Sequence, residues 1–249
     1  MAENKSKRSK GVRVRRVAEN VIIVCLAVIV ALSGWKVYTI LHDYSQQQNA
    51  YDDISDLAQK DGFTGDIDFD ALRKINPDIV GWLYYEDSLI NYPIVKGSDN
   101  DKYLTTMFDG NYGGFGTLFA DAETVAPFRQ FNTIVYGHHM RNGSMFGDLR
   151  KLKDTNYVLE HPRMELITPE GKYHLDIWAF LNQPADSRIY TNNITDREEC
   201  AEYLQMIQGL AEYTTSVEVT PEDRLVELST CAFEYQDARY VVACKMVPW

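Results

Sequence analysis

An uncharged apolar run near the N-terminus is the feature that most restricts what this chain can fold into. Residues 21–35 contain no charged side chain, and apolar residues continue to Leu41. A helix needs about 20 consecutive apolar residues to cross the hydrocarbon core of a bilayer, and residues 21–41 supply 21. We therefore expect a transmembrane signal-anchor over residues 17–41, with Trp35 and Tyr38 as interface anchors.

The distribution of charge gives this segment an orientation. Residues 1–16 hold seven basic residues and one acid, which gives a net charge of +6. The whole chain has a formal net charge of −11, so the remainder carries −17. Basic flanks stay on the cytoplasmic side, which predicts a single-pass protein with residues 1–16 as a cytoplasmic tail and everything after about residue 42 outside.

Two other interpretations of the apolar run remain. Ala31-Leu32-Ser33 before Gly34 is a passable cleavage site, so the segment could instead be a cleaved signal peptide. A buried core helix fits less well because of the basic prefix. Anchor and signal peptide alike place the acidic part of the chain outside the membrane.

Composition limits the class of the exported part. Charged residues at 24% and aromatic residues at 12% argue against a disordered chain, and 249 residues suffice for one ordinary domain with appendages, or for two small ones. The acidic balance argues against nucleic acid as a partner, because phosphate binding needs concentrated Lys and Arg. Four scattered cysteines are too few for a disulfide-built scaffold.

The exported part changes from helical to β-rich patterns along its length. Residues 42–67 have the spacing of a helical stalk or N-terminal helix, and residues 68–75 that of a second short helix. From Ile79 onward short β runs follow one another, with a hairpin signal at 169–171. Helices are expected at 144–152 and, from a capping box, between 195 and about 213. The pattern predicts one mainly β, barrel-like domain over residues 68–249.

Among the cysteines, Cys231 has the position of a functional thiol. Cys25 lies in the apolar run, Cys200 on the apolar face of the expected long helix, and Cys244 among inward positions of the last strand. Cys231 instead ends a β run, where side chains reach a site on a rigid scaffold. Three exported cysteines are an odd number, so even a Cys200–Cys244 disulfide would leave Cys231 free.

Two further residue types could join this thiol. His138 and His139 directly follow a β run and a glycine, although a histidine pair on a loop is more often a surface feature. Arg239 begins the final strand, and a hairpin of the last two strands would bring it to the same end as Cys231. A guanidinium there can lower a thiol pKa and donate to an oxyanion. The histidines and acids offer no metal-ligand spacing, so we expect neither a metal nor a cofactor.

These residues resemble a known family. The Tyr136-Gly137-His138 strand exit, the Leu228-Ser229-Thr230-Cys231 strand end and Arg239 are similar to those of sortases, the membrane-anchored cysteine transpeptidases of Gram-positive bacteria. Six further ordered segments resemble class B sortases: 76–83, 90–95, 100–104, 116–119, 144–149 and 237–239. The resemblance covers roughly residues 68–249.

The resemblance implies a fold and a set of site residues. The fold is a closed sortase β-barrel of about eight strands, with N-terminal helices and a long helix between the sixth and seventh strands. Cys231 would be the nucleophile, His138 the acid/base and Arg239 the oxyanion or substrate-positioning donor. The residues that would line the substrate groove are Leu104, Ser229, Ile189, Tyr190 and Thr191.

The implied reaction is peptide transfer to the cell wall. A sortase cleaves a C-terminal sorting motif after Thr through a thioacyl-enzyme, and a class B enzyme is expected to prefer an NPQTN-like pentapeptide. The expected partners are secreted proteins bearing a sorting signal and an amine of the peptidoglycan precursor or cross-bridge. The alternatives are a pilin-polymerising sortase, a hydrolytic cysteine protease and a non-catalytic membrane-tethered binding module.

Overall fold

The computed structural model describes residues 3–59 and 63–249, with side chains from residue 19 onward. Residues 1–2 of the expected basic tail and residues 60–62 of the expected stalk lie outside the described residues. Two compact units are present, Met1–Ala50 and Tyr51–Trp249. The second unit therefore begins within the segment that the sequence suggested as a stalk.

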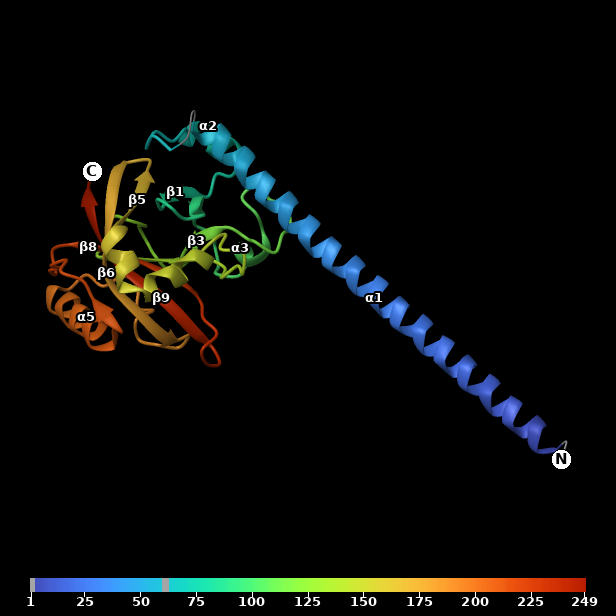
Figure 1. The fold of residues 1–249 in the computed structure, drawn as a ribbon. Helices are drawn as coiled ribbons and strands as arrows, with labels where there is room; N and C mark the ends of the chain where they lie inside the picture. The colour runs from blue at the N-terminus through green and yellow to red at the C-terminus, as the bar shows by residue number, and fades with distance from the viewer. Residues whose placement is uncertain (1–2, 60–62) are drawn as a thin grey trace. The chain divides into compact units, whose positions relative to one another are not determined.

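The N-terminal helix α1 (Glu3–Ala58) contains the apolar run (Figure 1). Within the described residues, its part Glu19–Ala58 is the one helix long and apolar enough to cross a membrane. The large apolar side chains of residues 21–41 are exposed, which is compatible with a membrane anchor. The last turns of α1 belong to the second unit, where Tyr51, Ile54 and Ala58 are buried.

The second unit is built on a closed β-barrel, which confirms the expected fold (Figure 1). The strands follow the spatial order β5-β1-β2-β3-β4-β8-β9-β6, and pairing of β5 with β6 closes eight strands into a ring. The two-residue strand β7, which the sequence pattern did not predict, pairs with β6. The strands are β1 (Ile79–Tyr84), β2 (Asn91–Val95), β3 (Leu118–Ala120), β4 (Asn132–Tyr136), β5 (Arg163–Thr168), β6 (Gly171–Pro184), β7 (Tyr213–Thr214), β8 (Arg224–Cys231) and β9 (Ala238–Pro248).

Short helices occupy the connections. Helix α2 (Phe69–Ile75) begins where expected, because the Asp68 side chain accepts a hydrogen bond from the backbone N–H of Ala71. Helix α3 (Lys102–Thr105) follows β2. The helix expected at 144–152 is a 3₁₀ helix, η1 (Gly147–Lys153), and α4 (Thr155–Glu160) follows it without having been predicted.

The long helix α5 (Arg197–Leu210) lies between the sixth and seventh strands, as expected. Its N-cap is Asp196, whose carboxylate accepts from the N–H groups of Glu198 and Glu199. It ends at Leu210 rather than near Tyr213, because Tyr213 starts β7. Its apolar face, which includes Cys200, packs with residues of β6, β8 and β9 in one buried cluster.

Candidate active site

Two strand pairings bring the candidate residues to one end of the barrel. Strand β4 runs parallel to β8, with Tyr136 opposite Ser229, so the residues that follow both strands emerge at the same edge. Strands β8 and β9 are antiparallel, with Cys231 opposite Arg239. The hairpin expected from the sequence is therefore present.

Gly137 joins β4 to the histidines and has room for no side chain. Its N–H donates to the Ser229 carbonyl at 3.1 Å, and its own carbonyl accepts from Oγ1 of Thr230 at 2.7 Å. A Cβ at this position would lie 2.4 Å from a methyl group of Leu118 and 2.7 Å from the ring of Phe146. The glycine thus lets the chain stay close to β8 and places His138 beside the end of that strand.

A cleft of about 310 Å³ opens at this edge. Cys231, His138 and Arg239 all line it, and each of the three side chains is partly exposed. The other lining residues are Asn100, Leu104, Phe119, Tyr136, Gly137, Ala185, Tyr190, Ser229 and Thr230. A thiol, an imidazole and a guanidinium that share one solvent-accessible cleft can serve as the nucleophile, the acid/base and the oxyanion donor of nucleophilic acyl transfer.

The two histidines have different surroundings. His138 lines the cleft, and its Nε2 donates to the carbonyl of Leu104 at 2.6 Å, which leaves Nδ1 as the basic nitrogen of the neutral ring. His139 does not line the cleft; its Nδ1 donates to the backbone carbonyl of Cys231 at 2.7 Å. Burial lowers the pKa of His139, more than its hydrogen bond to Cys231 raises it. His139 therefore holds the Cys231 backbone as a neutral donor.

Arg239 keeps its charge available to the cleft. Among the described residues its side chain makes one hydrogen bond, from Nη1 to the carbonyl of Ala238 at 2.9 Å, and forms no ion pair with a carboxylate. Tyr190 stands near it: burial raises the pKa of Tyr190 to about 12, while its hydrogen bond with Ser229 and the charge of Arg239 act in the opposite direction.

The residues expected in a substrate groove divide into two groups. Leu104, Tyr190 and Ser229 line the cleft, and the Tyr190 hydroxyl lies 2.9 Å from Oγ of Ser229. The Ile189 side chain is instead buried in the cluster under α5, and Thr191 is exposed toward a separate cavity beside α5. Successive side chains of a loop point in different directions, which a contiguous assignment from sequence does not resolve.

Some cleft residues were not singled out from the sequence. Asn100 donates to Asp121 at 3.2 Å and accepts from the N–H of Ala122 at 2.8 Å, and these bonds fix it at the cleft edge. It lies in the 100–104 segment that carried part of the resemblance, which was the available signal. Ala185 follows β6 and has no distinguishing pattern.

The remaining cysteines have the expected structural positions. Cys200 and Cys244 are buried and free, so the chain contains no disulfide between them. Burial raises the pKa of each thiol, which makes both poor nucleophiles. Cys231 is also free but partly exposed.

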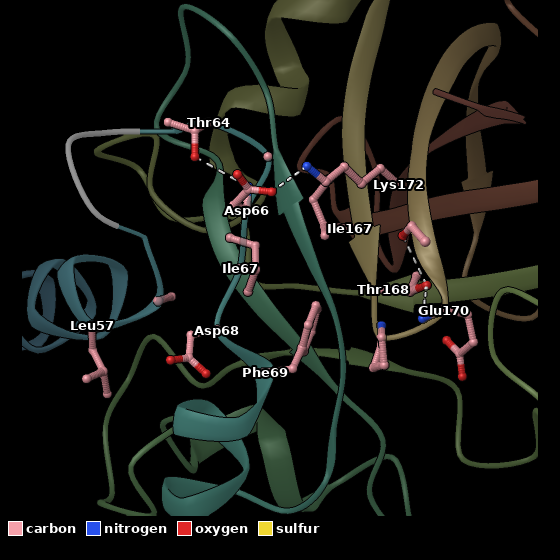
Figure 2. Close-up of a pocket in the computed structure, with 14 residues that line it drawn as sticks. Leu57, Thr64, Asp66, Ile67, Asp68, Phe69, Ile167, Thr168, Glu170 and Lys172 are labelled. Carbon is pink, nitrogen blue, oxygen red and sulfur yellow. Dashed lines mark hydrogen bonds and ion pairs between the residues drawn. The ribbon is translucent and has the colours of Figure 1, made fainter.

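A larger cavity of about 710 Å³ lies elsewhere in the same unit (Figure 2). It is lined by the end of α1, residues 64–69 and the β5–β6 turn, and the Asp66–Lys172 ion pair of 2.6 Å crosses it. It contains none of the three candidate catalytic groups, so size alone does not identify the functional site.

Comparison with known proteins agrees with this geometry. The sequence matches the family model of the sortase domain over residues 84–247. The chain belongs to the sortase family. Sortase B of Listeria monocytogenes is 33% identical over 223 residues, covering 86% of this chain and 91% of the relative.

Solved structures give the class of this sortase. The crystal structure of Bacillus anthracis sortase B in complex with AAEK1 has a TM-score of 0.75 and 31% identity, covering 84% of this chain and all of the other. A Staphylococcus aureus sortase B–substrate complex has a TM-score of 0.75 and 26% identity, covering 83% and 99%. The protein is therefore a class B sortase, and its relatives are cysteine transpeptidases.

Proposed function

We propose that this sortase cleaves a C-terminal sorting motif after Thr and transfers the protein to an amine of cell-wall peptidoglycan. Cys231 is the nucleophile, His138 the acid/base and Arg239 the oxyanion donor. The observation that carries the proposal is the cross-strand pair of Cys231 and Arg239 in the cleft that His138 also lines. Membership of the class B family supports an NPQTN-like pentapeptide as the motif.

The reaction has two acyl-transfer steps. The Cys231 thiolate attacks the Thr carbonyl, and Arg239 donates to the developing oxyanion. His138 protonates the departing amine as the peptide bond breaks, which leaves a thioacyl-enzyme. His138 then removes a proton from the acceptor amine, whose attack on the thioester releases Cys231 and forms the new amide bond.

The N-terminal helix supports a location at the outer face of the membrane. We propose residues 1–16 as a cytoplasmic tail, 17–41 as a retained anchor, 42–67 as a stalk or N-terminal helix and 68–249 as the extracellular catalytic domain. An apolar helix preceded by a basic prefix is the supporting observation. The anchor would hold the enzyme close to exported substrates and to lipid-linked wall precursors.

A peptide assay tests the reaction. Full-length protein in detergent is incubated with a fluorogenic NPQTN peptide, with and without a primary amine that mimics the wall acceptor. We expect cleavage after Thr, a ligated product when the amine is present, and neither product with Cys231→Ala. The Cys200→Ala variant is the matched control and should retain activity.

The outcomes separate the alternatives. If added amine neither raises turnover nor gives a ligated product, the protein is a hydrolytic cysteine protease. Polymer formation with a pilin subunit as acceptor, in place of wall attachment, would identify a pilin-polymerising enzyme. Full activity of Cys231→Ala would refute the assignment of the nucleophile.

A further inference from the structure

A buried carboxylic acid lies behind the candidate active site. Glu227 is on β8, four residues before Cys231, and it is 2% exposed. Side chains alternate along a strand, so Glu227 shares its face with Ser229 and Cys231. Among the described residues, no Lys, Arg or His forms an ion pair with it. A buried carboxyl without a counter-charge is unusual and requires an explanation.

The two contacts of the Tyr203 hydroxyl indicate the protonation state of the Glu227 carboxyl. The Tyr203 hydroxyl oxygen lies 2.5 Å from the carbonyl oxygen of Ile189 and 2.8 Å from Oε1 of Glu227. A phenol has one hydrogen, while a carbonyl and an ionised carboxylate only accept. Both contacts are hydrogen bonds only if the carboxyl of Glu227 carries a proton and donates it to Tyr203, which in turn donates to Ile189.

The groups that face Glu227 agree with a neutral carboxyl. They are Tyr203 from α5, Tyr136 from β4 and Tyr190 from the loop before α5, and burial raises the pKa of each. Burial likewise raises the pKa of Glu227 to about 8; hydrogen bonds that Tyr203 and Asn132 would donate to the ionised carboxylate act in the opposite direction but do not outweigh burial. None of these neighbours supplies a positive charge.

The same cluster holds the loop that forms one wall of the cleft. Tyr203 binds the carbonyl of Ile189, and Nδ2 of Asn132 donates to the carbonyl of Thr191 at 2.8 Å. The chain is thus held on both sides of Tyr190, whose hydroxyl meets Ser229 in the cleft. Movement of the 189–191 segment would move this wall.

We propose that protonated Glu227 is a positioning residue that sets the Tyr190 wall of the peptide-binding cleft through Tyr203 and the Ile189 carbonyl. The inference rests on the proposed function in taking a sorting peptide as the ligand. When Glu227 loses its proton to solvent, the Tyr203 hydrogen turns to the carboxylate and the Ile189 carbonyl loses its donor. The wall loosens, and the cleft binds peptide less tightly at alkaline pH.

The pH dependence of peptide binding tests the proposed role of Glu227, measured in a variant that does not cleave the peptide. The dissociation constant of a fluorescein-labelled NPQTN peptide is measured for full-length Cys231→Ala between pH 6 and 9. We expect affinity to fall about five- to tenfold, as for the loss of one hydrogen bond. Glu227→Gln in the same background keeps a donor at every pH and should give a flat profile. Glu160→Gln, at an exposed glutamate, is the matched control and should follow the Cys231→Ala profile.

A second measurement uses the unmodified sequence and does not depend on the variant folding. In protein with ¹³C-labelled glutamate carboxyl groups, the Glu227 resonance should report a neutral acid at pH 6.5 and titrate near pH 8. An ionised Glu227 at pH 6.5, or equal pH dependence of binding with Glu and with Gln at 227, would overturn the proposal.

Hydrogen exchange separates this proposal from the proposed function. Backbone amides of 189–191 should exchange faster above pH 8 in the wild type than in Glu227→Gln at the same pH. If that difference is found but the peptide binds at no pH, the proposed substrate is wrong and the positioning of the wall stands. If the peptide binds and is cleaved but this difference is absent, the role of Glu227 is wrong.

Discussion

Cys231 and Arg239 are cross-strand partners in the β8–β9 ladder, one at the end of β8 and the other at the second residue of β9. Directly opposite residues of an antiparallel pair have Cβ atoms about 4.5–5.5 Å apart. This register places a permanent positive charge beside the thiol on a rigid hairpin, rather than on separately mobile loops. The same cleft receives His138 from the neighbouring parallel strand.

Replacing Arg239 with lysine should lower kcat/KM by about 10²- to 10³-fold, the usual loss for an oxyanion donor. Lysine keeps the charge but lacks the planar fork of donors. The measurement is peptide cleavage, with Arg188→Lys at an exposed position as the matched control. Retention of wild-type kcat/KM by Arg239→Lys would show that charge alone suffices.

Substitution by glutamine should lower kcat/KM much more at His138 than at His139. His138→Gln removes the proposed acid/base and should lower kcat/KM by about 10²- to 10⁴-fold. His139→Gln keeps a side-chain donor for the Cys231 carbonyl and should cost about tenfold or less. Peptide cleavage by both variants at equal folded concentration, verified by thermal unfolding, checks this. A larger loss of kcat/KM with His139→Gln than with His138→Gln would assign the acid/base role to His139.

Alkylation should distinguish the thiols by accessibility. In the folded protein at neutral pH, iodoacetamide should modify Cys231, while buried Cys200 and Cys244 should react only after denaturant is added. Mass spectrometry of peptides reads each cysteine separately. Equal modification of Cys244 and Cys231 in the folded state would contradict the burial of Cys244.

Glu227 should make stability fall as pH rises. Burial raises its pKa to about 8 in the folded protein from the ordinary glutamate value of 4.5, so between these pH values the folded state holds a proton that the unfolded state has released. The contribution of this proton to the free energy of unfolding is fully present below about pH 4.5 and is lost as the pH rises through 8. Each unit of difference between the folded and unfolded pKa values corresponds to about 1.4 kcal/mol. In urea unfolding at pH 5, 7 and 9, the free energy of unfolding of the wild type should fall with rising pH relative to that of Glu227→Gln. Parallel profiles would contradict this.

Glu234 should show the opposite dependence. Burial raises its pKa, but hydrogen bonds from Lys153 and Tyr240 outweigh this and lower it to about 2. Its contribution is present above its unfolded pKa and is lost as pH falls toward 2. Because the pair is partly exposed, Glu234→Gln should cost about 1 kcal/mol or less at pH 7. The difference in unfolding free energy from wild type should shrink between pH 5 and 2.5; a constant difference would contradict this.

Much of this protein could be predicted from local pattern. The apolar run predicted a helix over residues 17–41, which lies within α1, and strand alternation with a turn signal predicted the β5–β6 hairpin. The strand-end position of Cys231 and the position of Arg239 predicted their proximity, because a hairpin with a short loop leaves few registers. These features depend on residues close in sequence, where periodicity and turn chemistry decide geometry.

The tertiary structure decided which of several similar residues meet in space. Two adjacent histidines are equivalent in sequence, yet His138 enters the cleft and His139 binds the back of Cys231. The sequence analysis did not single out Glu227, whose burial beside Tyr203 depends on α5 packing over that face of β8. Such contacts join residues 24 or more positions apart in the sequence. They depend on how the barrel closes and on where α5 packs, and a local sequence pattern contains neither piece of information.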